Sequence, residues 1–104
     1  MSITPDFIHD EIERQCYEIS LHADEERLAD GLTISSLESV LSDCKIIEKY
    51  PDDQRGESCL ALGFAPDGRA VHVVCGKNRS RHLIIITVYI PIMPKWKDPY
   101  ARNR

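Results

Sequence analysis

The sequence lacks any hydrophobic run long enough to cross a membrane. Its most apolar stretch, residues 82–90, is far shorter than the roughly 20 residues that a spanning helix needs. The N-terminal residues also lack a basic segment followed by an apolar run, which is the pattern of a secretory signal. We therefore expect a cytoplasmic protein with no membrane partner.

The sequence also lacks the motifs of common cofactor and metal sites. It contains no P-loop, no G-x-G-x-x-G motif, no nucleophile elbow and no H-E-x-x-H motif. None of its cysteines lies in a C-x-x-C pair, so we expect them to be reduced, small buried residues; a zinc site built with the four histidines is the alternative. We therefore expect no cofactor and no metal. The cysteines are Cys16, Cys44, Cys59 and Cys75.

Negative charge is concentrated in one part of the chain. The net charge of −4 combines a balance of −10 over residues 1–76 with a balance of +6 over residues 77–104. Such an asymmetry is typical of a protein that binds a polyanion at one end. The alternative is a solvated tail that is basic without binding anything.

The length and composition indicate a single globular domain. With 104 residues, the chain has room for one core, and 42% hydrophobic with 29% charged residues is ordinary for a soluble protein. We place the whole domain at residues 1–104, with a core at about 5–92. Residues 93–104 form a basic, aromatic tail.

Helix signals fill the first half of the sequence. Apolar residues at helical spacing predict a helix over residues 5–17, and strong helix formers predict a second over 22–30, with Ser20 as its cap. The pattern Ser35-x-x-Glu38 matches a capping box and predicts a third helix that ends near Lys45. We expect residues 46–56 to lead into a polar turn.

Strand signals follow in the second half. Alternating residues predict strands over 59–65 and 70–76, and a run of β-branched residues predicts a central strand over 82–90. Ile84, Ile86, Val88 and Ile90 would share one face of that strand, and the residues between them the other. The order predicts an α+β domain, with N-terminal helices on one face of a small antiparallel sheet of three or four strands.

The layout resembles a family of small bacterial domains of unknown function. The residues that carry the likeness are Ser20-Leu-His22-Ala, Ile34-Ser35, Gly63, Pro66-Asp-Gly68-Arg, Val71-His72-Val73-Val74 and Ile85-Ile86-Thr87-Val88-Tyr89-x-Pro91. The order of elements also resembles the BrnT and MqsR toxins of the wider RelE-like fold, over roughly residues 17–100. The resemblance implies a metal-independent endoribonuclease of a toxin–antitoxin pair, or an inactive relative. It also implies a zinc-finger-type antitoxin as partner.

Cleaving RNA without a metal requires a base, an acid and cations that face the phosphate. His22 and His72 match the motif and, with Tyr89, are the candidates for proton transfer; each has a structural alternative, as a cap, a strand or a core residue. The candidate cations are Arg27, Lys77, Arg79, Arg81 and Lys95, and Trp96 could stack on a base. We expect His9 and His82 to be surface residues.

Two geometric expectations follow from this hypothesis. His22 and His72 should lie within reach of one concave surface, and the cations of residues 77–104 should form a continuous patch. The competing hypothesis is a non-catalytic interaction module whose acidic helices bind a basic partner. A homodimer joined through a sheet edge or through residues 91–96 is compatible with both.

Overall fold

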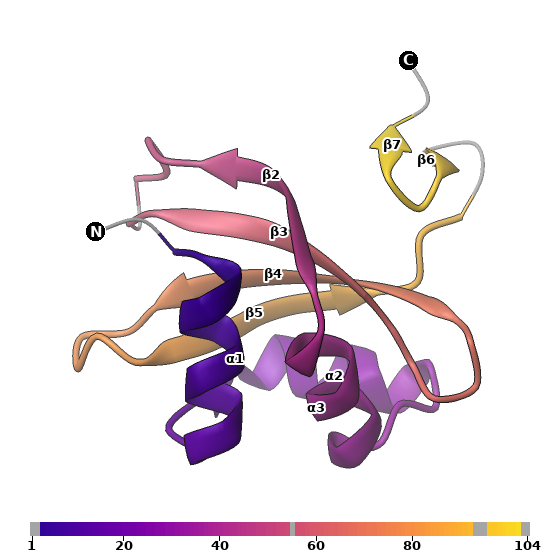
Figure 1. Cartoon of the computed structure of the whole chain (residues 1–104), viewed down its shortest axis with the longest axis horizontal. Coiled ribbons are helices and arrows are strands. Elements are labelled where there is room, and N and C mark those ends of the chain that lie inside the picture. The colour runs from indigo at the N-terminus through magenta and orange to yellow at the C-terminus, as the bar shows by residue number, and fades with distance from the viewer. Residues whose placement is uncertain (1–2, 55, 93–95, 103–104) are drawn as a thin grey trace.

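The computed structural model describes residues 3–54, 56–92 and 96–102. Within these ranges the chain is an α+β domain with three helices, a five-stranded sheet and a two-stranded hairpin (Figure 1). The elements in order are α1 (Pro5–Arg14), β1 (Glu18–Ile19), α2 (Leu21–Ala29), α3 (Ile34–Ser42), β2 (Lys45–Tyr50), β3 (Ser58–Phe64), β4 (Ala70–Lys77), β5 (Leu83–Tyr89), β6 (Trp96–Asp98) and β7 (Ala101–Arg102).

The five-stranded sheet is mixed rather than antiparallel. Its order is β1-β5-β4-β3-β2, and β1 runs parallel to β5 while the other neighbours are antiparallel. The predicted meander is confirmed as β3, β4 and β5. The prediction of three or four strands is wrong because β1 and β2 extend the sheet at its two edges. Residues 46–50, predicted only to lead into a polar turn, form most of β2. Its exposed Lys45 and Lys49 are typical of an edge strand.

Short polar side chains set the helix starts. Ser20 caps α2 as predicted, since its Oγ accepts a hydrogen bond from Ala23 N at 3.0 Å. The capping box at Ser35 is wrong, because Thr33 caps α3 and accepts from Ser36 N at 2.9 Å. α3 therefore begins two residues earlier than a box at Ser35 implies, and it ends at Ser42.

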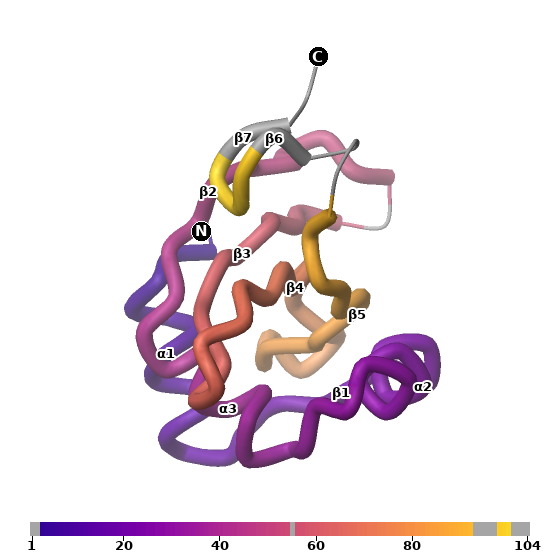
Figure 2. Tube along the Cα trace, turned by 90° about the vertical axis from the view of Figure 1, so that its right-hand side faces the viewer, coloured from indigo at the N-terminus to yellow at the C-terminus, as the bar shows by residue number. Residues whose placement is uncertain are grey.

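α1 and α3 cover one face of the sheet and form the core with it, while α2 lies beside β5 at the edge (Figures 1 and 2). α3 lies directly on β3 at Gly63, where a Cβ atom would stand 2.1 Å from the carbonyl oxygen of Val40. Three cysteines are buried in or beside this core, and all four are free thiols, as predicted. The buried core residues of the sheet are Cys59, Ala61, Ala65, Val71, Val73, Cys75, Leu83, Ile85 and Val88.

β5 departs from strict alternation, and it is not the central strand. The pairing with β4 slips between Val74 and Cys75, which leaves Ile86 as the extra residue of a bulge. Leu83 and Ile85 therefore share the core face with Val88 rather than with Thr87. β4 occupies the centre of the sheet, and β5 is bordered by the two-residue strand β1.

Beyond β1, helix α2 covers the open edge of β5. The Oγ of Ser20 donates to the carbonyl oxygen of Ile86 at 2.9 Å, and the carboxylate of Glu26 accepts from Val88 N at 2.9 Å. The C-terminal hairpin of β6 and β7 lies at the opposite end of the molecule from α2 and α3 (Figures 1 and 2). None of the helices in the described ranges combines the length and the apolar character needed to span a membrane.

Candidate functional site: a histidine–glutamate pair at a basic turn

The turn between β4 and β5 is closed by hydrogen bonds at its base. Asn78 N donates to the carbonyl oxygen of His82 at 2.8 Å, and the Asn78 side-chain oxygen accepts from His82 N at 3.0 Å. Arg81 has a left-handed backbone, with a φ of 67°. Arg79 and Arg81 are both exposed, so this turn presents two cations on a fixed backbone.

His82 is held by a buried carboxylate. Oε1 of Glu11 accepts from Nδ1 of His82 at 2.9 Å and from Leu83 N at 2.8 Å. Glu11 lies beside Ile8 and Ile12 on the core face of α1 and is only 6% exposed. A carboxylate accepts two hydrogen bonds here, which offsets the loss of hydration that burial of its charge entails.

The contact with Glu11 determines which nitrogen of His82 can act as a base. An ionised carboxylate only accepts, so Nδ1 carries the proton and the neutral ring keeps its lone pair on Nε2. The side chain is 47% exposed, and Nε2 has no hydrogen-bond partner within the described ranges. The pair therefore has the arrangement of a general base oriented by a carboxylate.

The cations of the turn are suited to a phosphate. No ion pair engages Arg79 or Arg81 within the part of the chain that the structure describes. Lys77 precedes the turn, and its ammonium lies 4.7 Å from the centre of the Phe7 ring. Residues 79–82 therefore expose two guanidinium groups and an imidazole within one short segment, and these are groups that bind phosphates.

His22 also pairs with a glutamate, but in an acidic setting. Its Nε2 lies 3.3 Å from Oε1 of Glu26, and its side chain is 68% exposed. The one arginine of α2, Arg27, contacts Asp24 at 2.7 Å and donates to the carbonyl oxygen of Leu32 at 3.1 Å. Arg27 therefore stabilises the end of α2 instead of facing solvent, and Glu25 adds negative charge nearby.

His72 is sealed inside the molecule. Its Nε2 lies 2.6 Å from the carbonyl oxygen of Pro99, and its Nδ1 lies 3.1 Å from the Tyr89 hydroxyl. A carbonyl only accepts, so Nε2 is protonated and the Tyr89 hydroxyl donates to Nδ1. His72 is 0% exposed, between Val71 and Val73 of the helix-covered core, and therefore points to the other face of the sheet.

The expectation that His22 and His72 share one concave surface is therefore wrong. Tyr89 lies with His72 and not with His22. Two residues of the tail, Lys95 and Trp96, were predicted to bind RNA. Lys95 and the side chain of Trp96 lie outside the described part of the structure. The continuous basic patch over residues 77–104 stays a prediction for the same reason.

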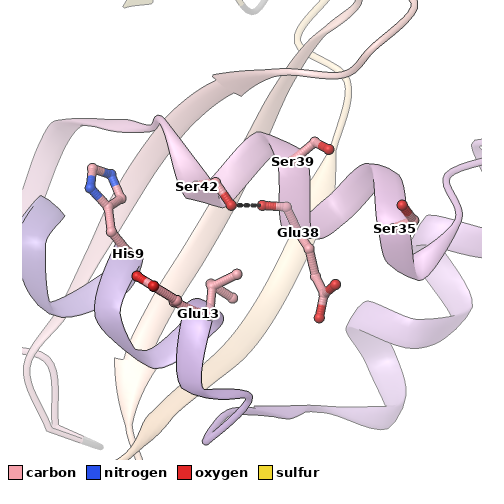
Figure 3. Close-up of a pocket in the computed structure, with 7 residues that line it drawn as sticks. His9, Glu13, Ser35, Glu38, Ser39 and Ser42 are labelled. Carbon is pink, nitrogen blue, oxygen red and sulfur yellow. Dashed lines mark hydrogen bonds between the residues drawn. The ribbon is translucent and has the colours of Figure 1, made fainter.

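A polar groove runs between α1 and α3 (Figure 3). Its volume is about 450 Å³, and in Figure 3 the carboxylate of Glu38 points away from His9. Tyr17 donates to this carboxylate at 2.5 Å, and burial together with this hydrogen bond raises the pKa of the Tyr17 hydroxyl. The described lining includes no lysine or arginine, so the groove is unsuited to a phosphate: His9, Ile12, Glu13, Ser35, Glu38, Ser39 and Ser42.

Cys44 is not a nucleophile at neutral pH, and the described residues form no metal-binding group. Cys44 lies 3.9 Å from His9, but burial raises the pKa of its thiol to about 12, so it stays protonated at neutral pH. No group of three His, Cys, Asp or Glu side chains within the described ranges could hold a metal ion.

Residues 19–90 match the family model described as Domain of unknown function (DUF4258). The chain belongs to this family. The matched segment of this DUF4258 protein includes Glu26, the residue beside His22, and the turn with Arg79 and Arg81. Glu11 precedes the matched segment. No curated protein and no solved structure shows a significant match to the chain.

The sequence analysis missed His82 and Glu11. His82 was expected to be a surface residue, and half of its side chain is indeed exposed. The available signal was Glu11 itself, because it interrupts the apolar face of α1 between Ile8 and Ile12. A carboxylate at a core-facing helical position indicates a buried partner.

Proposed function

We propose that this protein is a metal-independent endoribonuclease and the toxin of a toxin–antitoxin pair, on a RelE/BrnT-like form of the α+β fold. The observation that carries the proposal is the Glu11–His82 pair at a turn that exposes Arg79 and Arg81. The wider resemblance to toxin ribonucleases supports the same reaction class. It also supports a zinc-finger-type antitoxin as partner and a cytoplasmic location.

In the proposed reaction, Nε2 of His82 removes the proton of an RNA 2′-hydroxyl. The 2′ oxygen attacks the adjacent phosphorus, the bond to the 5′ oxygen breaks, and a solvent proton neutralises the leaving oxygen. The products are a 2′,3′-cyclic phosphate and a 5′-hydroxyl. Arg79 and Arg81 stabilise the charge that builds on the phosphate, and Glu11 stabilises the imidazolium of His82.

The second candidate function is a non-catalytic interaction module. The groove between α1 and α3 supports it, because this groove is lined by Glu13 and Glu38 with several serines and without a described lysine or arginine. Such a surface fits a basic partner. A homodimer through a sheet edge is compatible with either function.

The test is cleavage of single-stranded RNA by the purified protein, with EDTA present. We expect His82→Ala to slow cleavage about 10²- to 10⁴-fold, the usual contribution of general acid–base catalysis. His22→Ala is the matched control and should cleave like wild type. Cleavage that survives in His82→Ala and fails in His22→Ala would move the site to α2.

Growth of a bacterial host on induction separates the two candidate functions. Arrest by wild type and His22→Ala, but not by His82→Ala, supports a toxin that uses the basic turn. Equal arrest by all three proteins would support a toxin but contradict the assignment of its active site to the basic turn. Normal growth with soluble, folded wild-type protein, together with no cleavage in vitro, supports the interaction module.

A further inference from the structure

A second hollow opens on the sheet face that the helices leave uncovered. Its volume is about 280 Å³, at the lower end of small-ligand pockets, so it would hold a single ring system. Ile84 and Ile86 contribute apolar surface, and Gly76 lies between them in the lining. The polar side chains in the lining include Asp53, Glu57 and Ser58.

The side chains of Ile84 and Ile86 lie over Gly76 and form the floor of this hollow. A Cβ atom at Gly76 would stand 3.0 Å from Cδ1 of Ile86 and 3.7 Å from Cγ2 of Ile84. The glycine therefore lets both isoleucines lie close over the strand, which leaves a low apolar floor. A planar, apolar-faced ligand fits such a floor better than a branched one does.

The carboxylates at the rim are held by hydrogen bonds and can only accept. Oε2 of Glu57 accepts from Ile3 N at 3.3 Å, and Oδ2 of Asp53 accepts from the Ser58 hydroxyl at 3.2 Å. A ligand that pairs with these carboxylates therefore offers hydrogen-bond donors at its edge, such as N–H groups. A flat ring with N–H donors along one edge is a nucleobase, and guanine presents adjacent donors that match one carboxylate.

The hollow is continuous with the basic turn. Lys77 and Asn78 line it, and Asn78 is the first residue of the turn that carries Arg79 and Arg81. Arg81 follows Asn78 by three residues, which limits the distance between their Cα atoms to about 11 Å. A nucleotide with its base in the hollow can therefore place its phosphate toward these arginines.

We propose that this hollow is a nucleobase subsite that selects bases with N–H donors on their pairing edge, guanine first. The proposal rests on the RNA-acting function above, because it assigns the base next to the phosphate that the turn would hold. Glu57 recognises the donors, Ile84 and Ile86 pack against the ring, and Gly76 lets these two side chains lie close over the strand.

The test is an NMR titration of the full-length ¹⁵N-labelled protein with guanosine 5′-monophosphate, beside uridine 5′-monophosphate. We expect guanosine monophosphate to shift the amides of residues 76–78 and 84–86, and to bind at least about tenfold more tightly than uridine monophosphate. Equal binding of the two nucleotides, or no shift at these amides, would overturn the proposal.

Two variants localise the effect. Gly76→Val displaces the side chains of Ile84 and Ile86 from the floor and should abolish binding. Glu57→Gln keeps an acceptor for Ile3 N and should weaken guanosine monophosphate about tenfold. Glu13→Gln, an exposed carboxylate of the other groove, is the matched control and should bind like wild type. Unchanged binding in Glu57→Gln would contradict the assignment of Glu57.

Short RNAs separate this inference from the proposed function. Preference for UGU over UUU, with cleavage, supports both. Preference for guanosine monophosphate in a protein that cleaves no RNA supports the subsite and removes the nuclease. Cleavage of UGU and UUU at equal rates, with no binding of guanosine monophosphate, supports the nuclease and removes the subsite.

Discussion

Two histidine–glutamate pairs flank β5, one at each end of the strand. In the first, Oε1 of Glu11 accepts from the His82 ring and from Leu83 N. In the second, Oε1 of Glu26 accepts from Val88 N and lies 3.3 Å from Nε2 of His22. Each glutamate therefore joins a helix to a β5 backbone N–H and lies beside a histidine. The surroundings differ, because Arg79 and Arg81 lie beside the first pair whereas α2 surrounds the second with acidic residues.

The comparison shows that hydrogen bonding alone does not identify a phosphate site. Both glutamates lie beside an imidazole, but exposed cations favour an anionic substrate only at the first. Glu11 is also more deeply buried than Glu26, with side-chain exposures of 8% and 26%. The first pair therefore combines a buried carboxylate with two exposed arginines close by in the sequence.

Reversing the charge of the basic turn should have the largest effect. Arg79→Glu/Arg81→Glu should weaken the binding of single-stranded RNA at least about a hundredfold at low salt, because phosphate contacts dominate affinity. Fluorescence anisotropy across a salt series measures this. Lys45→Glu/Lys49→Glu makes the same charge change on the exposed edge strand β2. If both doubles weaken binding equally, net charge rather than the turn is responsible.

Replacing Glu11 should lower the free energy of unfolding more than replacing Glu26 does. Glu11→Ala leaves the buried Leu83 N–H without its acceptor and should lower the free energy of unfolding by about 2 to 3 kcal/mol. Glu26→Ala should lower it by about 1 kcal/mol, because water can reach that more exposed site. Urea denaturation followed by circular dichroism tests both. Equal losses would show that burial does not distinguish the pairs.

Glu38 of α3 accepts a hydrogen bond from the Tyr17 hydroxyl, which gives a third glutamate whose effect on stability can be measured at alkaline pH. Burial and the Glu38 hydrogen bond raise the pKa of Tyr17 above its ordinary value of 10.0, so the folded protein holds this proton more tightly than the unfolded chain. The stabilisation is complete below pH 10 and is lost as the pH rises further. We expect the free energy of unfolding to fall by at most about 1.4 kcal/mol per pH unit above pH 10.

Tyr17→Phe is the control for this alkaline loss. The variant should be about 1 kcal/mol less stable at neutral pH, because the hydrogen bond to Glu38 is gone. Its stability should then fall less steeply than that of wild type above pH 10. Parallel curves for the two proteins would assign the alkaline loss to other groups.

The histidines themselves should give the smallest differences in stability. His22→Ala should change the free energy of unfolding by no more than about 0.5 kcal/mol, since its ring is exposed and Val88 keeps its acceptor. His82→Ala should cost about 1 kcal/mol, because the buried Glu11 loses a donor. Thermal melting with matched buffers resolves the two, and identical melting temperatures would remove the distinction.

Much of the fold was predictable because local signals agreed with the packing. Ser20 capped α2, and alternating residues located β3 and β4. What failed depended on tertiary contacts. The bulge at Ile86 places Val88 on the same face as Leu83 and Ile85, against the predicted alternation. The two-residue strand β1 forms by parallel pairing with β5. No periodicity within either segment encodes these features.

The candidate site was predictable only in its cations. Arg79 and Arg81 were read from the turn, but the histidine beside them was assigned to the surface. The pairing of His82 with Glu11 joins residues 71 positions apart, and no local pattern shows it. His72 illustrates the opposite case, because a strand histidine with an apolar neighbour on each side became a buried structural residue.

The two helix-to-β5 contacts also govern when this chain can fold during its synthesis. Glu11 and Glu26 meet their backbone donors 72 and 62 residues further along the chain. At about 5 to 20 residues per second, the ribosome needs roughly 3 to 14 s to make that intervening chain. Until β5 emerges, Glu11 and Glu26 lack these backbone donors, so we expect a nascent chain halted before residue 83 to be more open to proteases and chaperones.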